Sequence, residues 1–213
     1  TNNRRAVFLD HTSLDLGDLD LNPLHRCFSE LQLYSDTTPD NVVERLQGAG
    51  IAISNKIPLN AETLAACPDL KLILVAATGT NNIDLQAAHA QGITVANCQG
   101  YGTPSVAQHT LGLLLALATR LIDYQKAVTD GQWQQAKQFC LLDFPIVELE
   151  GKTLGLFGHG ELGSAVAKLA EAFGMRVLLG QIPGRPARAD RLSLDELLPQ
   201  VDALTFHCPL NEH

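Results

Sequence analysis

Residues 154–163 read LGLFGHGELG, an apolar run that leads into three glycines. The run predicts a buried strand, and residues 161–173 carry the apolar spacing of a helix. Between them, Gly158 allows a tight turn, Gly160 lets the backbone approach a ligand, and Gly163 lets the helix pack closely on the strand. Because free amides and the helix dipole favour a phosphate group, the stretch predicts a site for the pyrophosphate of a dinucleotide. The alternative is a glycine-rich turn that serves only close packing.

Strand and helix patterns alternate on both sides of this stretch. The expected strands are residues 6–10, 31–34, 51–54, 70–77, 93–96, 153–157, 176–180 and 203–208. The expected helices are residues 39–48, 60–67, 84–92, 103–129, 161–173 and a short one that begins after Ser193. This alternation predicts an α/β protein with parallel sheets covered on both faces, that is, doubly wound sheets.

The long helix expected over residues 103–129 lies between two groups of strands. It is apolar on more than one face, so we expect it to be deeply packed. Such a helix suits a boundary, and we expect one domain over residues 1–98 and a second over residues 99–213. Because three strands make only half of a doubly wound dinucleotide-binding domain, the second domain is expected to be incomplete in this chain.

The composition is that of a globular protein, with 46% hydrophobic residues, 18% charged residues and a formal net charge of −8. A net-negative chain lacks the basic face that binds phosphate backbones, so we expect no nucleic-acid partner. The longest apolar stretch, residues 111–118, is too short to span a bilayer, and no signal-peptide core is present at the start. Five widely spaced cysteines predict reduced thiols without a metal site. We therefore expect a cytoplasmic protein with no membrane partner.

The segment after the strand at 176–180 bears on the choice of cofactor. An acidic residue at this point bonds the ribose hydroxyls of NAD, whereas a nearby arginine accepts the 2′-phosphate of NADP. Here Gln181 stands where the acid is expected, and Arg185 and Arg188 follow. The segment favours NADP(H), unless both arginines belong only to a solvated loop.

Four further stretches carry a family resemblance. They are ATGTNNID at residues 77–84, GITVAN at 92–97, GYGTPSVAQH at 100–109 and LEGKTLG at 149–155. In this order, and with the glycine loop, they span the chain nearly end to end. The sequence resembles the D-isomer-specific 2-hydroxyacid dehydrogenases, above all the glycerate dehydrogenases, also called hydroxypyruvate reductases.

The resemblance implies a flavodoxin-like substrate-binding domain followed by a Rossmann-type NAD(P)-binding domain. It implies that the amides of Thr78 and Gly79 hold the substrate carboxylate, since a tight turn of free amides forms an anion nest. It places Thr78 and Thr103 near the nicotinamide. The other implied cofactor contacts are His159, Glu161 and Leu162 in the glycine loop, and Cys208 and Pro209 beside the adenosine.

The implied activity is hydride transfer between a nicotinamide cofactor and a small D-2-hydroxy acid or 2-oxo acid, with glycerate and hydroxypyruvate as the expected pair. The family uses an arginine to orient the 2-oxo acid, and a histidine paired with an acid to move the proton. These residues belong to segments that would follow His213, so no catalytic residue is assigned and these 213 residues alone are expected to be inactive. A homodimer is the expected assembly. Two alternatives stay open, namely an NAD(H)-sensing interaction protein and a nucleotide-binding remnant without turnover.

Overall fold

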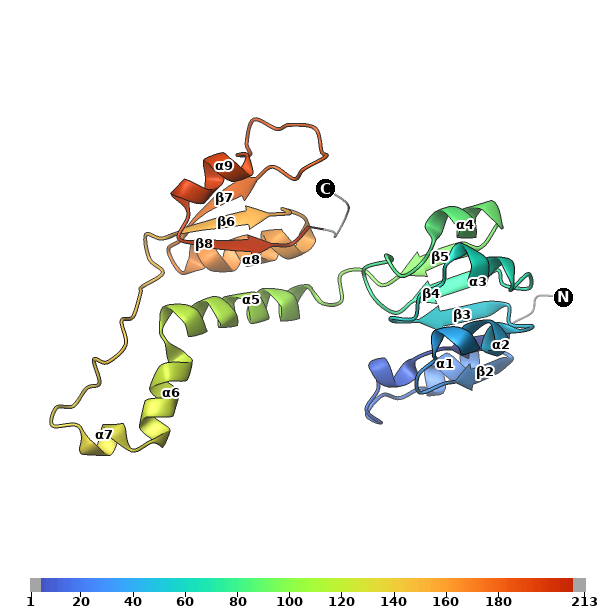
Figure 1. The fold of residues 1–213 in the computed structure, drawn as a ribbon, viewed down its shortest axis with the longest axis horizontal. Helices are drawn as coiled ribbons and strands as arrows, with labels where there is room; N and C mark the ends of the chain where they lie inside the picture. Colours follow the sequence, from blue (N-terminus) through green and yellow to red (C-terminus); the bar gives the residue numbers. More distant parts are fainter. Residues whose placement is uncertain (1–4, 209–213) are drawn as a thin grey trace. The chain divides into compact units, whose positions relative to one another are not determined.

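The computed structural model describes residues 5–208, and the chain divides after Gly100 into two compact units (Figure 1). Each unit contains one parallel sheet with helices packed against it. The predicted α/β fold with parallel sheets is confirmed.

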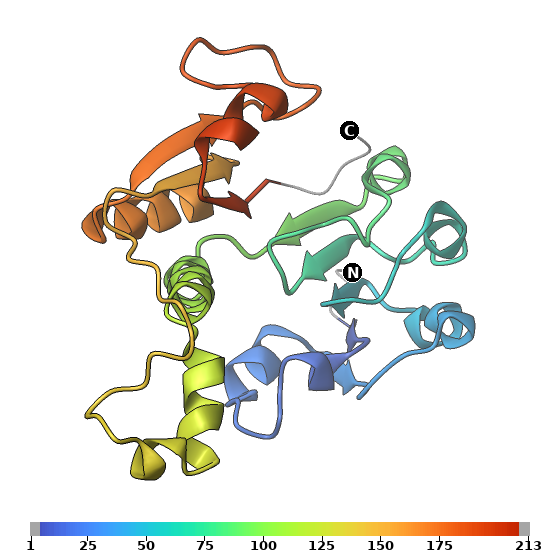
Figure 2. The ribbon, with the colours of Figure 1, turned by 60° about the vertical axis from the view of Figure 1, so that its left-hand side comes forward.

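The first unit has five parallel strands in the order β2-β1-β3-β4-β5, which is a flavodoxin-like order. The strands are β1 Arg5–Phe8, β2 Glu30–Leu33, β3 Ile51–Ser54, β4 Leu72–Val75 and β5 Thr94–Asn97. The helices are η1 His11–Ser13, α1 Asn22–Cys27, η2 Pro39–Asn41, α2 Val42–Leu46, α3 Ala61–Ala65 and α4 Leu85–Ala90. Figure 2 shows α2, α3 and α4 following one another along one side of this sheet. Helix α1 was not predicted from the sequence.

The second unit has three parallel strands in the order β7-β6-β8. Its elements after residue 150 are β6 Thr153–Phe157, α8 Glu161–Ala172, β7 Arg176–Gly180, α9 Leu194–Leu197, η3 Leu198–Gln200 and β8 Ala203–Phe206. An isolated parallel bridge joins Gly180 to Leu192 on the side of β7 away from β6. The chain therefore moves outward from β6 and then returns to its other side at β8. Such a reversal creates a crevice at the carboxyl ends of the strands.

Side-chain caps set the starts of several helices. Asn60 accepts a hydrogen bond from the Thr63 amide at 2.9 Å, and Asp84 accepts one from the Ala87 amide at 2.9 Å. Ser193 and Glu196 form a reciprocal capping box before α9. These caps satisfy amides that have no partner inside the helix.

Each unit has its own apolar core. The largest fully buried side chains in the first are Leu9, Leu46, Leu59, Leu64, Leu70 and Ile73. In the second, β6 is buried along its whole length and packs with α8 through Leu156, Val166 and Ala170. Strand β6 is thus the central strand of its sheet in both pairing and burial.

The prediction of one continuous helix over residues 103–129 is wrong. The segment consists of α5 Thr103–Ala118 and α6 Leu121–Thr129, bent by 64°. The bend occurs at Arg120, whose φ of +53° lies in the left-handed region and interrupts the helical hydrogen-bond ladder. Nothing at Arg120 marks this in the sequence, because arginine is a good helix former.

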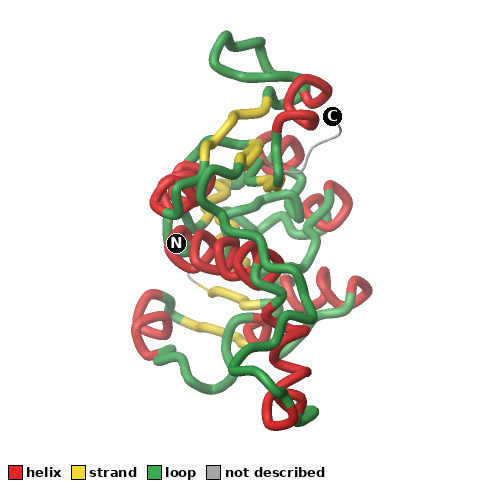
Figure 3. The backbone as a smooth tube through the Cα atoms, turned by 90° about the vertical axis from the view of Figure 1, so that its left-hand side faces the viewer, coloured by secondary structure: helices red, strands yellow, loops and turns green. Residues whose placement is uncertain are grey.

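The expected deep packing of this segment is also wrong. Of α5, only Ala107 and Leu111 are buried, while Leu117 is 75% exposed. After α6 come α7 Gln132–Gln135 and then residues 136–152, which run without helix or strand to β6 (Figure 3). Among the described residues no single helix is long and apolar enough to cross a bilayer. The bent pair α5–α6 would be long and apolar enough if its two helices are counted together, on length and composition alone.

A buried carboxylate joins two loops at the carboxyl end of the first sheet. Asp10, which follows β1 and is 2% exposed, accepts hydrogen bonds from the Asn55 amide at 2.9 Å and from the Lys56 amide at 2.7 Å. Asp15 accepts three amide hydrogen bonds within its own loop, but it is only partly buried. The two aspartates thus make similar bonds in different surroundings.

We predict that Asp10→Ala lowers the free energy of unfolding by about 2 kcal/mol or more, because the two amides lose their acceptor away from water. Asp15→Ala is the matched control and should cost clearly less, since water can replace its carboxylate. Urea denaturation of both variants measures the difference. Equal losses would contradict the claim that burial at Asp10 matters.

Candidate functional site

Two glycines allow three elements of the second unit to pack with their backbones in direct contact. Gly158 has a φ of +91°, and a Cβ there would collide with the backbone of His207 and Cys208 after β8. A Cβ on Gly163 would lie on the carbonyl oxygen of Gly158. Glycine is therefore required at both positions to bring the end of β6, the start of α8 and the end of β8 together.

Gly160 is different, because nothing in the chain requires a glycine there. Its φ of −90° and ψ of −155° suit any residue, and a Cβ would meet no atom within 4 Å. The space beside this peptide is open at the first turn of α8. A missing side chain at an open position fits the close approach of a ligand to the backbone.

The amides of residues 159–163 have no acceptor in the described part of the chain. They point from the N-terminus of a twelve-residue helix, where the partial positive charge of the dipole is concentrated. The acidic side chain at this turn, Glu161, accepts a hydrogen bond from the Thr103 hydroxyl at 2.6 Å. The structure thereby brings Thr103, at the start of α5, to the glycine loop.

A cavity of about 430 Å3 opens beside the glycine loop. Its lining is Gly158, His159, Gly160, Gln181, Ile182, Arg185, Pro186, Arg188, Arg191, His207 and Cys208. The predicted residues among these come from three separate segments of the chain. Among the described residues, the lining holds three arginines and no carboxylate, although the chain carries a net charge of −8.

Gln181 organises the loop that forms one wall of this cavity. Its Nε2 donates to the carbonyl oxygens of Ile182, Arg185 and Pro186 at 3.2, 3.1 and 3.1 Å. Its Oε1 accepts from the Arg188 amide at 3.3 Å. The side chain is therefore already used to close the loop over residues 181–188.

Two arginines on that loop differ in their partners. Arg188 donates from Nε and Nη2 to the carboxylate of Asp190 at 2.9 and 3.0 Å. This hydrogen bond lowers the pKa of Asp190, so the pair is charged near neutral pH. The Arg185 side chain is exposed and makes no ion pair among the described residues. Much of the charge of Arg188 is thus already neutralised.

His207 and Arg191 line the cavity but were not predicted as site residues. Burial lowers the pKa of His207 below its ordinary value of 6.5, so its ring is neutral near pH 7. Its Nε2 lies 3.0 Å from the Thr205 hydroxyl. A signal for His207 was its place directly after the last strand, at the crevice where the strand order reverses. Arg191 gave no comparable signal, because the bridge at Leu192 is too short to read as a strand.

The remaining predicted residues lie elsewhere. Thr78 and Gly79 follow β4 in the first unit, and both are exposed. Their amides have no acceptor in the described part of the chain, and Asn97 holds the turn by donating to the Thr78 carbonyl oxygen at 2.7 Å. Leu162 is half-buried in the first turn of α8. Pro209 lies outside the described residues.

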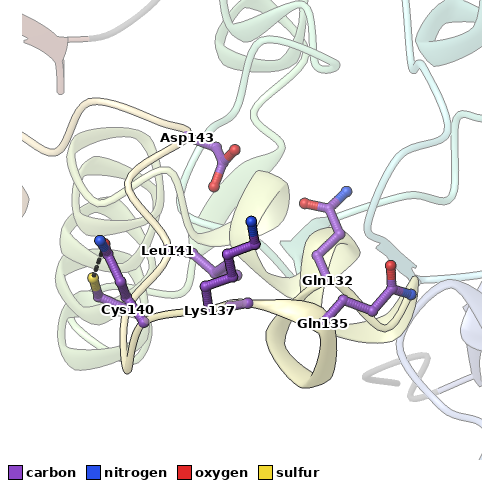
Figure 4. Close-up of a pocket in the computed structure, with 8 residues that line it drawn as sticks. Gln132, Gln135, Lys137, Cys140, Leu141 and Asp143 are labelled. Carbon is purple, nitrogen blue, oxygen red and sulfur yellow. Dashed lines mark hydrogen bonds between the residues drawn. The ribbon is translucent and has the colours of Figure 1, made fainter.

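A second cavity, of about 450 Å3, contains none of the predicted site residues (Figure 4). It is formed by α7 and the loop after it, and its polar side chains include Gln132, Lys137 and Asp143. Within residues 5–208 no cluster of three metal-ligating side chains occurs here or elsewhere. The glycine-loop cavity is thus the candidate site of this unit.

Comparison with known proteins matches nearly the whole chain. The family model described as D-isomer specific 2-hydroxyacid dehydrogenase, catalytic domain, matches residues 7–205. The chain is 46% identical over 208 residues to a glycerate dehydrogenase of Methylorubrum extorquens, covering 97% of this chain and 64% of that protein. It is 37% identical over 213 residues to a hydroxypyruvate reductase of Blautia hydrogenotrophica, covering 97% and 66%.

A solved structure is also similar to this chain. The D-lactate dehydrogenase of Aquifex aeolicus complexed with NAD and lactic acid superposes with a TM-score of 0.79 at 29% identity, covering 97% of this chain and 61% of that one. The chain thus spans slightly less than two thirds of the length of the proteins it matches.

We predict opposite behaviour for two glycines of the loop. Gly163→Ala should lower the free energy of unfolding by about 2 kcal/mol or more, because its Cβ would overlap the Gly158 carbonyl oxygen. Gly160→Ala should cost less than about 1 kcal/mol, since it loses only the modest advantage of glycine over alanine at a helix N-cap. Chemical denaturation of both variants tests this, and a large loss at Gly160 would show that glycine is needed there for folding.

Proposed function

The chain belongs to the family of D-isomer specific 2-hydroxyacid dehydrogenases, and on that premise we propose that the whole protein is an NAD(P)-dependent oxidoreductase. It would transfer a hydride between a nicotinamide cofactor and a small D-2-hydroxy acid or 2-oxo acid. The names of the two relatives favour glycerate and hydroxypyruvate as the substrate pair. The single observation that carries the proposal is the row of unpartnered amides at residues 159–163, beside a cavity rich in arginine.

The dinucleotide site is proposed in the second unit, which begins after Gly100. The amides of His159, Glu161 and Leu162 would bind the pyrophosphate, since an anion at a helix N-terminus gains hydrogen bonds and a favourable dipole. Gly160 leaves room for this contact, and Cys208 would border the adenosine. By the family resemblance Pro209 would join it, and Thr103 would lie near the nicotinamide.

The substrate site is proposed in the first unit, which ends at Gly100. The unpartnered amides of Thr78 and Gly79 form a turn that could receive a carboxylate, and Asn97 fixes that turn. By the resemblance Thr78 would also contact the cofactor. When bound, a nicotinamide cofactor would supply or accept the hydride. What Thr78 and Gly79 would contribute is position, because they would hold the carboxylate at one end of the substrate.

No residue of this chain is assigned to proton transfer. The arginine, acid and histidine that the family uses have no counterpart at the positions described here. A sensor of NAD(H) or a nucleotide-binding protein without turnover would need the same dinucleotide site. Binding and turnover must therefore be measured separately.

NADP(H) is the favoured cofactor in this proposal. Gln181 replaces the acid that would bind the ribose hydroxyls of NAD, and Arg185 and Arg188 line the cavity. Five free cysteines fit a reducing compartment, which supports the cytoplasm as the location. The net negative charge gives no support for a nucleic-acid partner.

A homodimer is proposed because large apolar side chains are exposed on α5, α6 and the loop that follows. Phe139 is 94% exposed and Leu142 is 82% exposed, and Leu117 and Ile122 continue the series on the two helices. Exposed apolar surface of this kind commonly marks a site of association. A second copy of the chain is the proposed partner.

Steady-state and binding measurements test the enzyme. The whole protein should reduce hydroxypyruvate with NADPH or NADH and oxidise D-glycerate in reverse. Gly160→Ala should weaken coenzyme binding by about tenfold or more, because a methyl group would occupy space next to the pyrophosphate amides, while the fold is kept. Binding without turnover of any 2-oxo acid would favour the sensor. Absence of binding by folded protein would contradict the proposal.

Light scattering tests the assembly. Leu117→Asp combined with Ile122→Asp should convert a dimer to a monomer, since buried charges without partners are costly in an interface. Leu16→Asp in the first unit is the control, because that leucine is 94% exposed, more than Leu117 at 75% and Ile122 at 66%, but lies outside the proposed interface. A dimer that survives the double substitution would exclude this surface.

A further inference from the structure

We propose that Arg191 binds the adenosine 2′-phosphate of NADP(H) and is the residue that distinguishes this coenzyme from NAD(H). The proposal rests on the dinucleotide site described under the proposed function. It goes beyond that site because it assigns coenzyme selectivity to one of the three arginines that line the cavity.

The backbone holds Arg191 at the end of β7. The next residue, Leu192, forms the parallel bridge with Gly180, with its amide on the Leu179 carbonyl oxygen at 2.9 Å and its own carbonyl on the Gln181 amide at 2.7 Å. The Arg191 amide donates to the Arg188 carbonyl oxygen at 3.1 Å. Arg191 therefore stands beside Gln181, where proteins of this fold contact the adenosine ribose.

The Arg191 side chain has a hydrogen-bond donor with no acceptor. Its Nε has essentially no exposed surface and no partner, and it is the one such side-chain atom in the described part of the chain. A buried donor left without an acceptor costs free energy, because it has lost water and gained nothing. Arg191 also lines the glycine-loop cavity. Because Nε is closed to a water-sized group, the guanidinium would have to turn toward the cavity for a phosphate oxygen to accept its hydrogen bond, and the donor would lose no further hydration.

The other two arginines are less suited to the role. Arg188 already makes a two-point ion pair with Asp190, which a phosphate would have to replace. Arg191 influences the same carboxylate only through its charge. Arg185 is exposed on the loop, so ordering its side chain would cost conformational entropy. Arg191 is half-buried on a bridged backbone and is therefore organised before the ligand arrives.

The surroundings favour an anion over a ribose hydroxyl pair. Within residues 5–208, no carboxylate lines the cavity to accept hydrogen bonds from a 2′-hydroxyl. The Gln181 oxygen, which could serve instead, is engaged by the Arg188 amide. Gln181 thus shapes the loop as a positioning residue, while Arg191 supplies the positive charge that distinguishes NADP(H) from NAD(H).

Titration calorimetry with four ligands tests the proposal without any turnover: NADPH, NADH, 2′,5′-ADP and 5′-AMP. Arg191→Met should weaken NADPH and 2′,5′-ADP by about tenfold to 100-fold, the effect of losing charge-assisted hydrogen bonds. It should leave NADH and 5′-AMP within about twofold. Arg188→Met is the matched control and should weaken NADPH by only a few-fold, because its charge is already paired.

Two results would overturn the proposal. One is an equal loss for NADH and NADPH in Arg191→Met, and the other is a larger selective loss in Arg188→Met or Arg185→Met. If the wild-type protein binds NADH and Arg191→Met changes nothing, this inference fails while the dinucleotide site stands. If the folded wild-type protein binds none of the four ligands, both fail.

Thermal unfolding separates recognition from a structural role. Without ligand, Arg191→Met should melt at the same or a higher temperature, because it removes a buried donor that has no partner. NADPH should raise the melting temperature of the wild type more than NADH does, and this difference should vanish in the variant. A ligand-free variant that melts several degrees lower would assign Arg191 to the fold and overturn the proposal.

Discussion

Backbone-to-backbone contact at Gly158 and Gly163 is the constraint on which the rest of the second unit depends. Gly158 touches the backbone after β8, and the start of α8 lies against the Gly158 carbonyl. No side chain fits into either contact. Because α8 is held this close to β6, its first amides are fixed at the carboxyl end of the sheet, at the crevice where the strand order reverses.

In this arrangement the main chain supplies hydrogen-bond donors and the side chains supply positive charge. In the described part of the chain, the amides at the start of α8 and those of Thr78 and Gly79 are donors without an acceptor, and donors of this kind suit anions without adding a positive side chain. Positive side chains are concentrated on the loop after β7, where the described residues that line the cavity include arginines and no carboxylate. A protein of net charge −8 thus keeps a small basic cavity. Local geometry, rather than overall charge, decides which anions it suits.

Regular patterns made much of the fold predictable. The apolar run of β6, the glycines after it and the helix starts near Asn60, Asp84 and Ser193 are local signals that the structure confirms. The break at Arg120 and the exposure of α5 were missed. A left-handed arginine is set by its surroundings, and the same apolar pattern describes a buried helix and one left open. The candidate residues of the glycine loop could be named because motif spacing carries them.

By itself, therefore, the sequence determined the strand-and-helix order, the glycine loop and the family, because each depends on residues close together in the chain. Only the tertiary structure decided which arginines line the cavity. It also decided that the Gln181 side chain hydrogen-bonds within its own loop, and that Arg188 is paired while the Arg191 Nε has no acceptor among the described residues. Partners and burial arise where segments far apart in the chain meet. A side chain's chemistry depends on those neighbours and on its access to water, and neither can be read from its own segment.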